Sequence, residues 1–317
     1  MQDTLDNWIS VSFTDTDMVW NVTITEEMLD IANSATLEEN CKLAVMNLPS
    51  TVGSRPAVCL SGGIDSQTVV DTFLYAGVTP EVVIFNFLDD HNIHDVSHAI
   101  KFCESRNITP RLIDFDVIRF LNNQSYDFAT KYKISSPQFA VHLYLAGKLK
   151  DLGYTSVIFG GNSLSQFVRE GFYTPKKEET DWCKYSREIN FPIIGSFWLQ
   201  DWRLSLMATI YMPYYNGNIA NYQSKIIGYK TMGYDVMPQE QKYNGFETIK
   251  KYYEEMTGDG WTFEHRFREP IKKYAGIYKN NLIVVDSNIS NRIRDMKQKI
   301  YKEISLWDLR IKKSGHA

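Results

Sequence analysis

Apolar and polar positions change their spacing at about Pro56. Residues 57–60 (AVCL) form a short, fully apolar run, and residues 81–87 (EVVIFNF) form a second, mostly apolar run. Between them, residues 65–77 (DSQTVVDTFLYAG) carry apolar side chains at helical spacing and end in glycine. Continuous apolar runs are typical of strands buried on both faces, and the spacing of the middle segment is typical of a helix. The pattern therefore predicts a strand, a loop, a helix and a second strand in succession.

The same alternation continues to about residue 165. Residues 94–107 have the pattern of a helix, whereas 110–115 and 155–159 have that of buried strands. A third helix is predicted to begin at Pro137, since proline suits a first helical turn. Strands that alternate with helices favour a parallel sheet with right-handed crossovers, so we predict a doubly wound α/β domain.

The flanking segments carry other patterns. Residues 8–24 alternate β-branched and aromatic residues around a Thr-Asp pair, which predicts a hairpin, and a helix is predicted over 26–47. A late hairpin is predicted with its turn at 279–281. The predicted parts are an N-terminal hairpin and helix (1–50), the α/β domain (51–165) and an aromatic-rich, mostly helical C-terminal region (166–317).

Composition narrows the class of protein. The chain has 317 residues, a formal net charge of −4 and 44% hydrophobic residues, the balance of an ordinary globular protein. Nothing in this charge attracts nucleic acid or an anionic membrane over the whole surface, so neither partner is expected. The first ten residues lack the pattern of a signal peptide, and no run of about 18 apolar residues occurs. We expect a cytoplasmic protein whose four cysteines, which show no paired spacing, are reduced.

The first predicted strand is followed by the turn SGGIDS, residues 61–66. In a parallel sheet this turn lies at the carboxyl end of the strand, where ligands bind. Glycines let backbone N–H groups approach a ligand closely, and the N-terminus of the next helix attracts an anion, so phosphate is the expected occupant. The Asp65 carboxylate suits either a helix cap or a magnesium ligand. The plainer alternative is a strand-to-helix connection whose glycines serve only the turn.

The same six residues resemble the PP-loop of the ATP pyrophosphatase family, whose pattern is Ser-Gly-Gly-x-Asp-Ser. The resemblance, which is closest to asparagine synthetase-like and NAD synthetase-like members, covers about residues 55–165 and implies an adenine nucleotide alpha hydrolase-like sheet. It also implies that MgATP binds, that a substrate oxygen attacks the α-phosphate, and that pyrophosphate leaves. The residues it implies for the pyrophosphate cradle are Ser61, Gly62, Gly63, Asp65 and Ser66, with Asp65 as the Mg²⁺ ligand. The backbone of Phe85 and Asn86 would read the adenine.

A second loop, GGNSLSQ at 160–166, ends a strand that such folds place beside the first strand. We therefore expect Gly160, Gly161 and Asn162 to face the first loop, the alternative being that the two glycines only relieve crowding. The loop has no acid where the family carries one. Either Glu170, Asp89 or Asp90 supplies the second Mg²⁺ ligand, or Asp65 serves alone.

Several other residues are weaker candidates. Arg169 follows the second loop and could neutralise pyrophosphate or hold a substrate carboxylate. His94 and His98 are four residues apart on a predicted helix, but no other metal-ligand spacing accompanies them, so solvent-facing or capping roles are favoured. Cys103 and Cys183 are the thiols that an RNA-thiolating enzyme would need.

The sequence thus favours an ATP-dependent synthetase that adenylates a small carboxylate or amide-like substrate. Gln2 follows Met1 where a glutaminase domain would begin with cysteine, so nitrogen would come from free ammonia or a partner subunit. Two alternatives stay open: base thiolation of RNA, and a nucleotide-binding module without turnover. The sequence leaves the substrate, the nucleophile and assembly as a homo-oligomer open.

Overall fold

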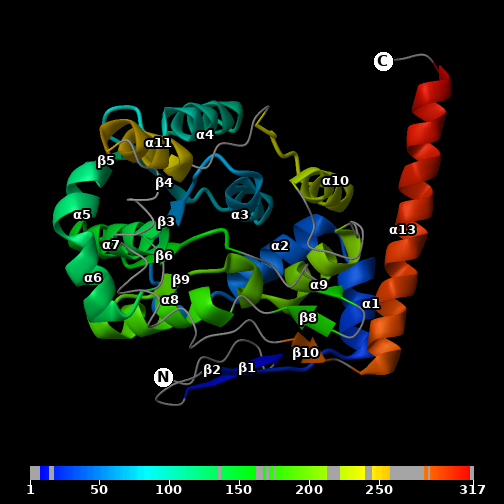
Figure 1. Cartoon of the computed structure of the whole chain (residues 1–317). Coiled ribbons are helices and arrows are strands. Elements are labelled where there is room, and N and C mark those ends of the chain that lie inside the picture. The colour runs from blue at the N-terminus through cyan, green and yellow to red at the C-terminus, as the bar shows by residue number, and fades with distance from the viewer. Residues whose placement is uncertain are drawn as a thin grey trace.

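The structure is a computed structural model, and it describes residues 8–13, 18–134, 137–161, 167–168, 171–173, 176–212, 222–239, 245–257, 282–284 and 286–314. Among them, five parallel strands form the central sheet in the order β5-β4-β3-β6-β9 (Figure 1). The strands are β3 (Pro56–Cys59), β4 (Glu81–Phe87), β5 (Arg111–Phe115), β6 (Ser156–Ile158) and β9 (Ile193–Ile194). The predicted doubly wound α/β domain is confirmed.

The order of the strands places the candidate loops. From β3 the chain adds β4 and then β5 on one side, and it later adds β6 and β9 on the other side. The direction therefore reverses between β3 and β6, which pair in parallel as predicted. This reversal is the switch point at which ligands of such sheets bind. The loops that follow β3 and β6 both leave the sheet there.

Alternate residues of the strands enter two separate hydrophobic cores, as expected for a sheet buried on both faces. Val58, Val82 and Ile84 belong to one core, whereas Ala57 and Val83 belong to the other. The helices of the first core are α1 (Glu26–Ser34), α2 (Leu37–Met46), α3 (Ile64–Tyr75), α4 (Ile93–Ser105), α9 (Trp202–Tyr211), α10 (Tyr222–Met232) and the start of α13 (Ser287–Ser314). Those of the second are α5 (Val117–Asn123), α6 (Ser125–Tyr132), α7 (Pro137–Asp151), α8 (Lys176–Ile189) and α11 (Gly245–Thr257).

Smaller elements complete the described part. The predicted N-terminal hairpin is present as the antiparallel pair β1 (Ile9–Phe13) and β2 (Met18–Val22). A second small sheet joins β7 (Phe167–Val168), β8 (Gly171–Tyr173) and β10 (Leu282–Val284). There are also two short 3-10 helices, η1 (Ser50–Val52) and η2 (Phe197–Gln200). In the described residues β10 pairs with β8, and the predicted hairpin turn at 279–281 lies outside them.

The single helix predicted over 26–47 is wrong, because the chain forms two helices that meet at Thr36. The Thr36 side chain accepts a hydrogen bond from the Glu39 backbone, and the Glu39 carboxylate accepts one from the Thr36 backbone at 2.8 Å. This reciprocal cap starts a new helix and holds the pKa of Glu39 below its usual value.

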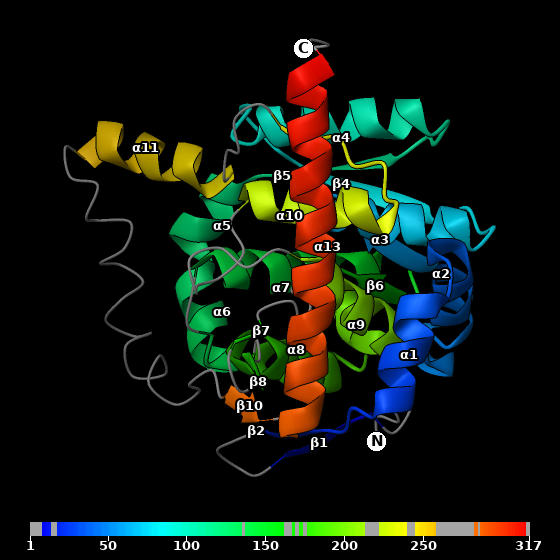
Figure 2. The same ribbon diagram turned by 90° about the vertical axis from the view of Figure 1, so that its right-hand side faces the viewer.

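The long helix α13 (Ser287–Ser314) packs on α9; it stands at the right-hand side of the molecule in Figure 1 and crosses the front of it in Figure 2. Near its start Arg292 pairs with Glu26 and Asp30 of α1. Further along, Lys297 is buried, and its ammonium donates to the Thr209 and Met212 carbonyls at the end of α9. Burial lowers the pKa of Lys297 to about 7. Within the described residues no helix is long and apolar enough to cross a bilayer.

Candidate functional site

The loop after β3 is closed by the hydroxyl group of Ser66. This hydroxyl accepts a hydrogen bond from the Ser61 backbone at 3.1 Å and donates to the Gly63 carbonyl at 2.8 Å. Ser66 is buried, whereas Ser61 is exposed. The resemblance implied both serines as parts of the pyrophosphate cradle. In the structure Ser66 shapes the loop from inside, and Ser61 lies at its exposed rim.

Helix α3 begins at this loop without a side-chain cap. Its N-cap is Gly63, which carries no side chain, and Asp65 is its second residue. The structure gives Asp65 no capping role, because its carboxylate is bonded elsewhere. Backbone N–H groups in the first turn of a helix attract anions. A bound anion can therefore take the place that a capping side chain has in other helices.

The second loop packs directly against the first. A Cβ atom on Gly160 would lie 3.0 Å from the backbone carbonyl carbon and oxygen of Asp65. On Gly161 it would lie 2.4 Å from the Cα of Ser196. Gly160 thus allows the loop after β6 to meet the loop after β3, and Gly161 allows it to meet the segment after β9. Asn162, the third candidate in this loop, lies outside the described residues, and so do Arg169 and Glu170.

Asp65 is held by two side chains of α10, which the sequence analysis missed. Lys225 Nζ donates to both carboxylate oxygens of Asp65, at 3.0 and 2.9 Å, and Tyr229 Oη donates to one of them at 2.6 Å. Lys225 and Tyr229 are four residues apart, so they lie on one face of the helix. Burial and the neighbouring Asp65 charge raise the pKa of Tyr229 well above its usual value, so the phenol stays protonated and donates.

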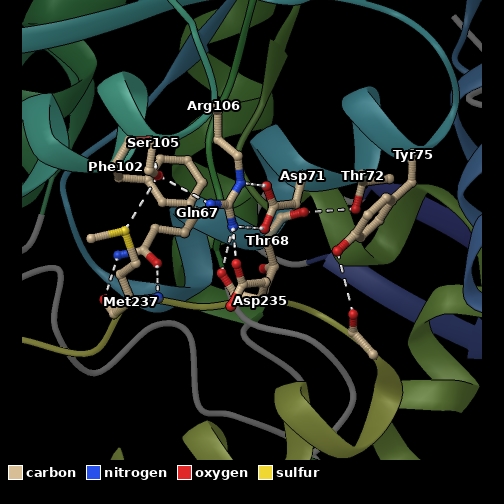
Figure 3. Close-up of polar contacts among 11 residues, drawn as sticks. Gln67, Thr68, Asp71, Thr72, Tyr75, Phe102, Ser105, Arg106, Asp235 and Met237 are labelled. Carbon is tan, nitrogen blue, oxygen red and sulfur yellow. Dashed lines mark hydrogen bonds and ion pairs between the residues drawn. The ribbon is translucent and has the colours of Figure 1, made fainter.

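The segment 233–239, which follows α10, is tied to the first loop through Gln67. The Gln67 amide donates to the Gly62 carbonyl and to the Met237 carbonyl, each at 2.8 Å, and its oxygen accepts from the Met237 backbone at 2.8 Å. Figure 3 shows Gln67 reaching from α3 to Met237 in this segment. One buried side chain therefore links the conformation of the loop to the segment that leads away from Lys225 and Tyr229.

An ion-pair cluster next to Gln67 holds the same segment (Figure 3). Arg106, the C-cap residue of α4, pairs with Asp71 of α3 at 3.0 Å and with Asp235 at 3.3 Å. Tyr75 of α3 donates to the Gly233 carbonyl at 3.3 Å. Burial raises the pKa of Asp71, and its bonds to Arg106 oppose that shift. The cluster fixes the end of α10 and, through it, the place of Lys225 beside Asp65.

The end of β4, where the backbone was predicted to read adenine, is already bonded. Asn92 Nδ2 donates to the Phe85 carbonyl at 2.9 Å, and the Phe87 backbone N–H donates to Asn92 Oδ1 at 2.8 Å. The Asn86 side chain points elsewhere and donates to Asp114 at 2.7 Å. The Phe85 carbonyl and the Phe87 N–H thus form an acceptor and donor pair, which an asparagine side chain satisfies in this structure. The backbone of Asn86, the other predicted residue, faces the opposite side of the strand, toward β5.

The weaker candidates find little support in the described part of the chain. No group of three or more His, Cys, Asp or Glu residues that could hold a metal ion occurs there. His98 lies within hydrogen-bond distance of the Met237 carbonyl, at 2.7 Å, which gives it a structural contact. Burial raises the pKa of Cys103 to about 11 and that of Cys41 to about 12. The thiolate that RNA thiolation would need is therefore disfavoured at Cys103.

Comparison with known proteins adds only distant likenesses. No protein-family model matches the sequence, and no curated protein matches it. Among solved structures, the NMN synthetase from Francisella tularensis is 15% identical, with 82% of this chain and 99% of that chain covered and a TM-score of 0.33. The NH3-dependent NAD synthetase from Campylobacter jejuni is 13% identical, with 82% and 100% covered and a TM-score of 0.34. The U34-tRNA thiolase from Methanococcus maripaludis is 12% identical, with 79% and 82% covered and a TM-score of 0.36. At such TM-scores neither the fold family nor the activity of those proteins carries over to this chain.

Replacing Lys225 by methionine should weaken the binding of tripolyphosphate about 10-fold, because the site loses a cation that is bonded to Asp65 at the loop. Lys225→Met keeps the length and much of the packing of the side chain. The matched control is Lys230→Met, which removes an exposed lysine from the last turn of the same helix. Isothermal titration calorimetry of both variants would measure the effect. Equal affinities of the two variants for tripolyphosphate would show that Lys225 binds Asp65 and does not contact the phosphates.

Proposed function

We propose that this protein is an ATP-dependent synthetase that transfers AMP to a small carboxylate or amide-like substrate and releases pyrophosphate. The observation that carries the proposal is the loop at 61–66: an uncapped helix N-terminus behind two glycines, at the switch point of a parallel sheet. Such a site suits the phosphates of a nucleotide. The resemblance of this loop to the PP-loop pattern supports ATP and cleavage at its α-phosphate.

The proposed reaction depends mainly on the alignment of the substrate with the phosphates of ATP and on the neutralisation of the phosphate charge. A substrate oxygen attacks the α-phosphorus, the bond between the α-phosphorus and the bridging oxygen breaks, and pyrophosphate leaves with both electrons of that bond. A nucleophile such as ammonia then attacks the activated carbon, loses a proton to solvent, and AMP leaves. The chain has to hold the phosphates in line and offset their charge. The first turn of α3 and the Lys225 ammonium would do this work.

The donor set fits one Mg²⁺ ion that arrives with the nucleotide. Mg²⁺ is commonly held by one or two carboxylates together with substrate phosphates, and Asp65 offers one carboxylate at the loop. When bound, the ion would neutralise phosphate charge. Lys225 and Tyr229 now hold the carboxylate of Asp65, so Lys225 would have to turn away from it. The released ammonium would then bind the phosphates.

The test is to identify the nucleotide products. The purified protein would be incubated with MgATP and a panel of small carboxylates, with and without ammonium, and the nucleotides resolved by chromatography. We expect AMP and pyrophosphate in equal amounts, dependent on one class of acid; heat-unfolded protein is the blank. ADP and phosphate, or intact ATP in every reaction, would contradict the proposed synthetase. Ammonium dependence would separate free ammonia from nitrogen supplied by a partner subunit.

A second candidate is a nucleotide-binding module without turnover. The observation that favours it is the Asp65 carboxylate, whose oxygens accept three hydrogen bonds from Lys225 and Tyr229. If Lys225 keeps this place when the nucleotide binds, the ammonium stands where the metal would be. Tight ATP binding with no product over hours would identify this module.

A further inference from the structure

The edge of β4 continues beyond its neighbour β3, beside the candidate loop. The Leu60 backbone donates to the Val83 carbonyl at 2.9 Å, and Ser61 then starts the loop. Alternate peptide groups of a strand face the same side. The Phe85 carbonyl and the Phe87 N–H therefore follow Val83 on the side that β3 has just left. They form an acceptor and donor pair on the side of β4 from which β3 and the loop depart.

The side chain that bonds this edge of β4 belongs to Asn92, and its hydrogen bonds are unusual for its position. Asn92 is the N-cap of α4, and asparagine at an N-cap usually accepts a hydrogen bond from the first turn. Here it makes no side-chain cap, because both ends of its carboxamide bond the β4 backbone. The turn between β4 and Asn92 includes Asp89 and Asp90, which have φ angles of +58° and +57°. Consecutive left-handed residues other than glycine are strained.

We propose that Asn92 is an internal occupant of the base site and that the adenine of ATP displaces it. This inference rests on the proposed function. A carboxamide offers an acceptor and a donor side by side, and adenine offers the same pair at N1 and its 6-amino group. The base can therefore take over the bonds to Phe85 and Phe87 one for one. The displaced Asn92 can then cap α4, so the exchange loses no hydrogen bond.

If adenine has to displace Asn92, binding of the base is weakened, whereas binding of the phosphates is not. A site that is open for only a fraction of the time binds its ligand more weakly by that fraction. Asn92 thus lowers the affinity for ATP, while a ligand without a base does not sense it. Tripolyphosphate is such a ligand, and it uses only the loop.

The experiment compares the two ligands in three forms of the full chain: wild type, Asn92→Ala and Asn92→Asp. Aspartate keeps a good N-cap residue, so this variant should fold even if alanine fails, and its carboxylate repels the Phe85 carbonyl and opens the edge. With Mg²⁺ present, we expect the Kd for ATP to fall about 5-fold in either variant and the Kd for tripolyphosphate to stay the same. Asn107→Gly, at the other end of α4, is the matched control and should change neither.

The outcomes separate this inference from the proposed function. If both ligands bind the wild type and the variants leave the ATP affinity unchanged, or weaken it, Asn92 is only a structural bond and the inference is wrong. Equal changes for both ligands would also overturn it, because a base-site occupant cannot act on tripolyphosphate. If neither ligand binds the wild type, the proposed function fails and takes the inference with it.

Discussion

Asp65→Asn should lower the rate of pyrophosphate release by at least about 100-fold, a loss of the size seen when one charge-stabilising group is removed from an active site. Asparagine has the same shape but no charge. It removes the negative charge that the loop offers through Asp65, and with it the ion-pair partner of Lys225. The initial rate of AMP formation at saturating MgATP measures the effect, and circular dichroism checks that the variant is folded.

The control for this variant is Asp127→Asn. Asp127 is an exposed acid in the first turn of α6, so its loss tests the general effect of removing a charge from the start of a helix. It should keep the wild-type rate within about 2-fold, since a surface charge in that place contributes little. A wild-type rate in Asp65→Asn would show that this carboxylate takes no part in the chemistry.

The sheet and the first loop could be predicted because their signals are local. Continuous apolar runs mark strands buried on both faces, and glycines between a strand and a helix mark a ligand loop. The edge strand β9 was not predicted, because its two residues are too few to show any periodicity. The break at Thr36 escaped because the apolar spacing carries on through it, whereas the reciprocal cap with Glu39 decides the structure.

The site itself was only half predictable. Lys225 and Tyr229 lie 160 and 164 positions from Asp65 in the sequence, on a helix with no motif of its own. Only packing brings them to the loop, through Gln67 and Arg106. Their four-residue spacing places Lys225 and Tyr229 on one face of a helix, but it does not identify Asp65 as the carboxylate that they bind. Long-range polar contacts of this kind need coordinates.

The second large effect is expected at Gly62, where alanine should destabilise the fold by about 3 kcal/mol and abolish ATP binding. Gly62 has φ +79°, which costs an L-residue about 1 to 2 kcal/mol. A Cβ there would also lie 2.5 Å from the backbone carbonyl oxygen of Asp95, so α4 or the loop must move. Overpacking of this kind costs about 1 to 3 kcal/mol more. Urea unfolding gives the change in stability, and calorimetry gives the binding.

Gly77 provides the matched control, because it has φ +77° and no atom within 4 Å of an added Cβ. Gly77→Ala should therefore show the conformational strain alone, about 1 to 2 kcal/mol, with ATP binding unchanged. The difference between the two variants measures the packing of the loop against α4. Equal losses of unfolding free energy would mean that the loop moves away from α4 without an energetic penalty. A tight contact with α4 would then not be what fixes the conformation of the phosphate site.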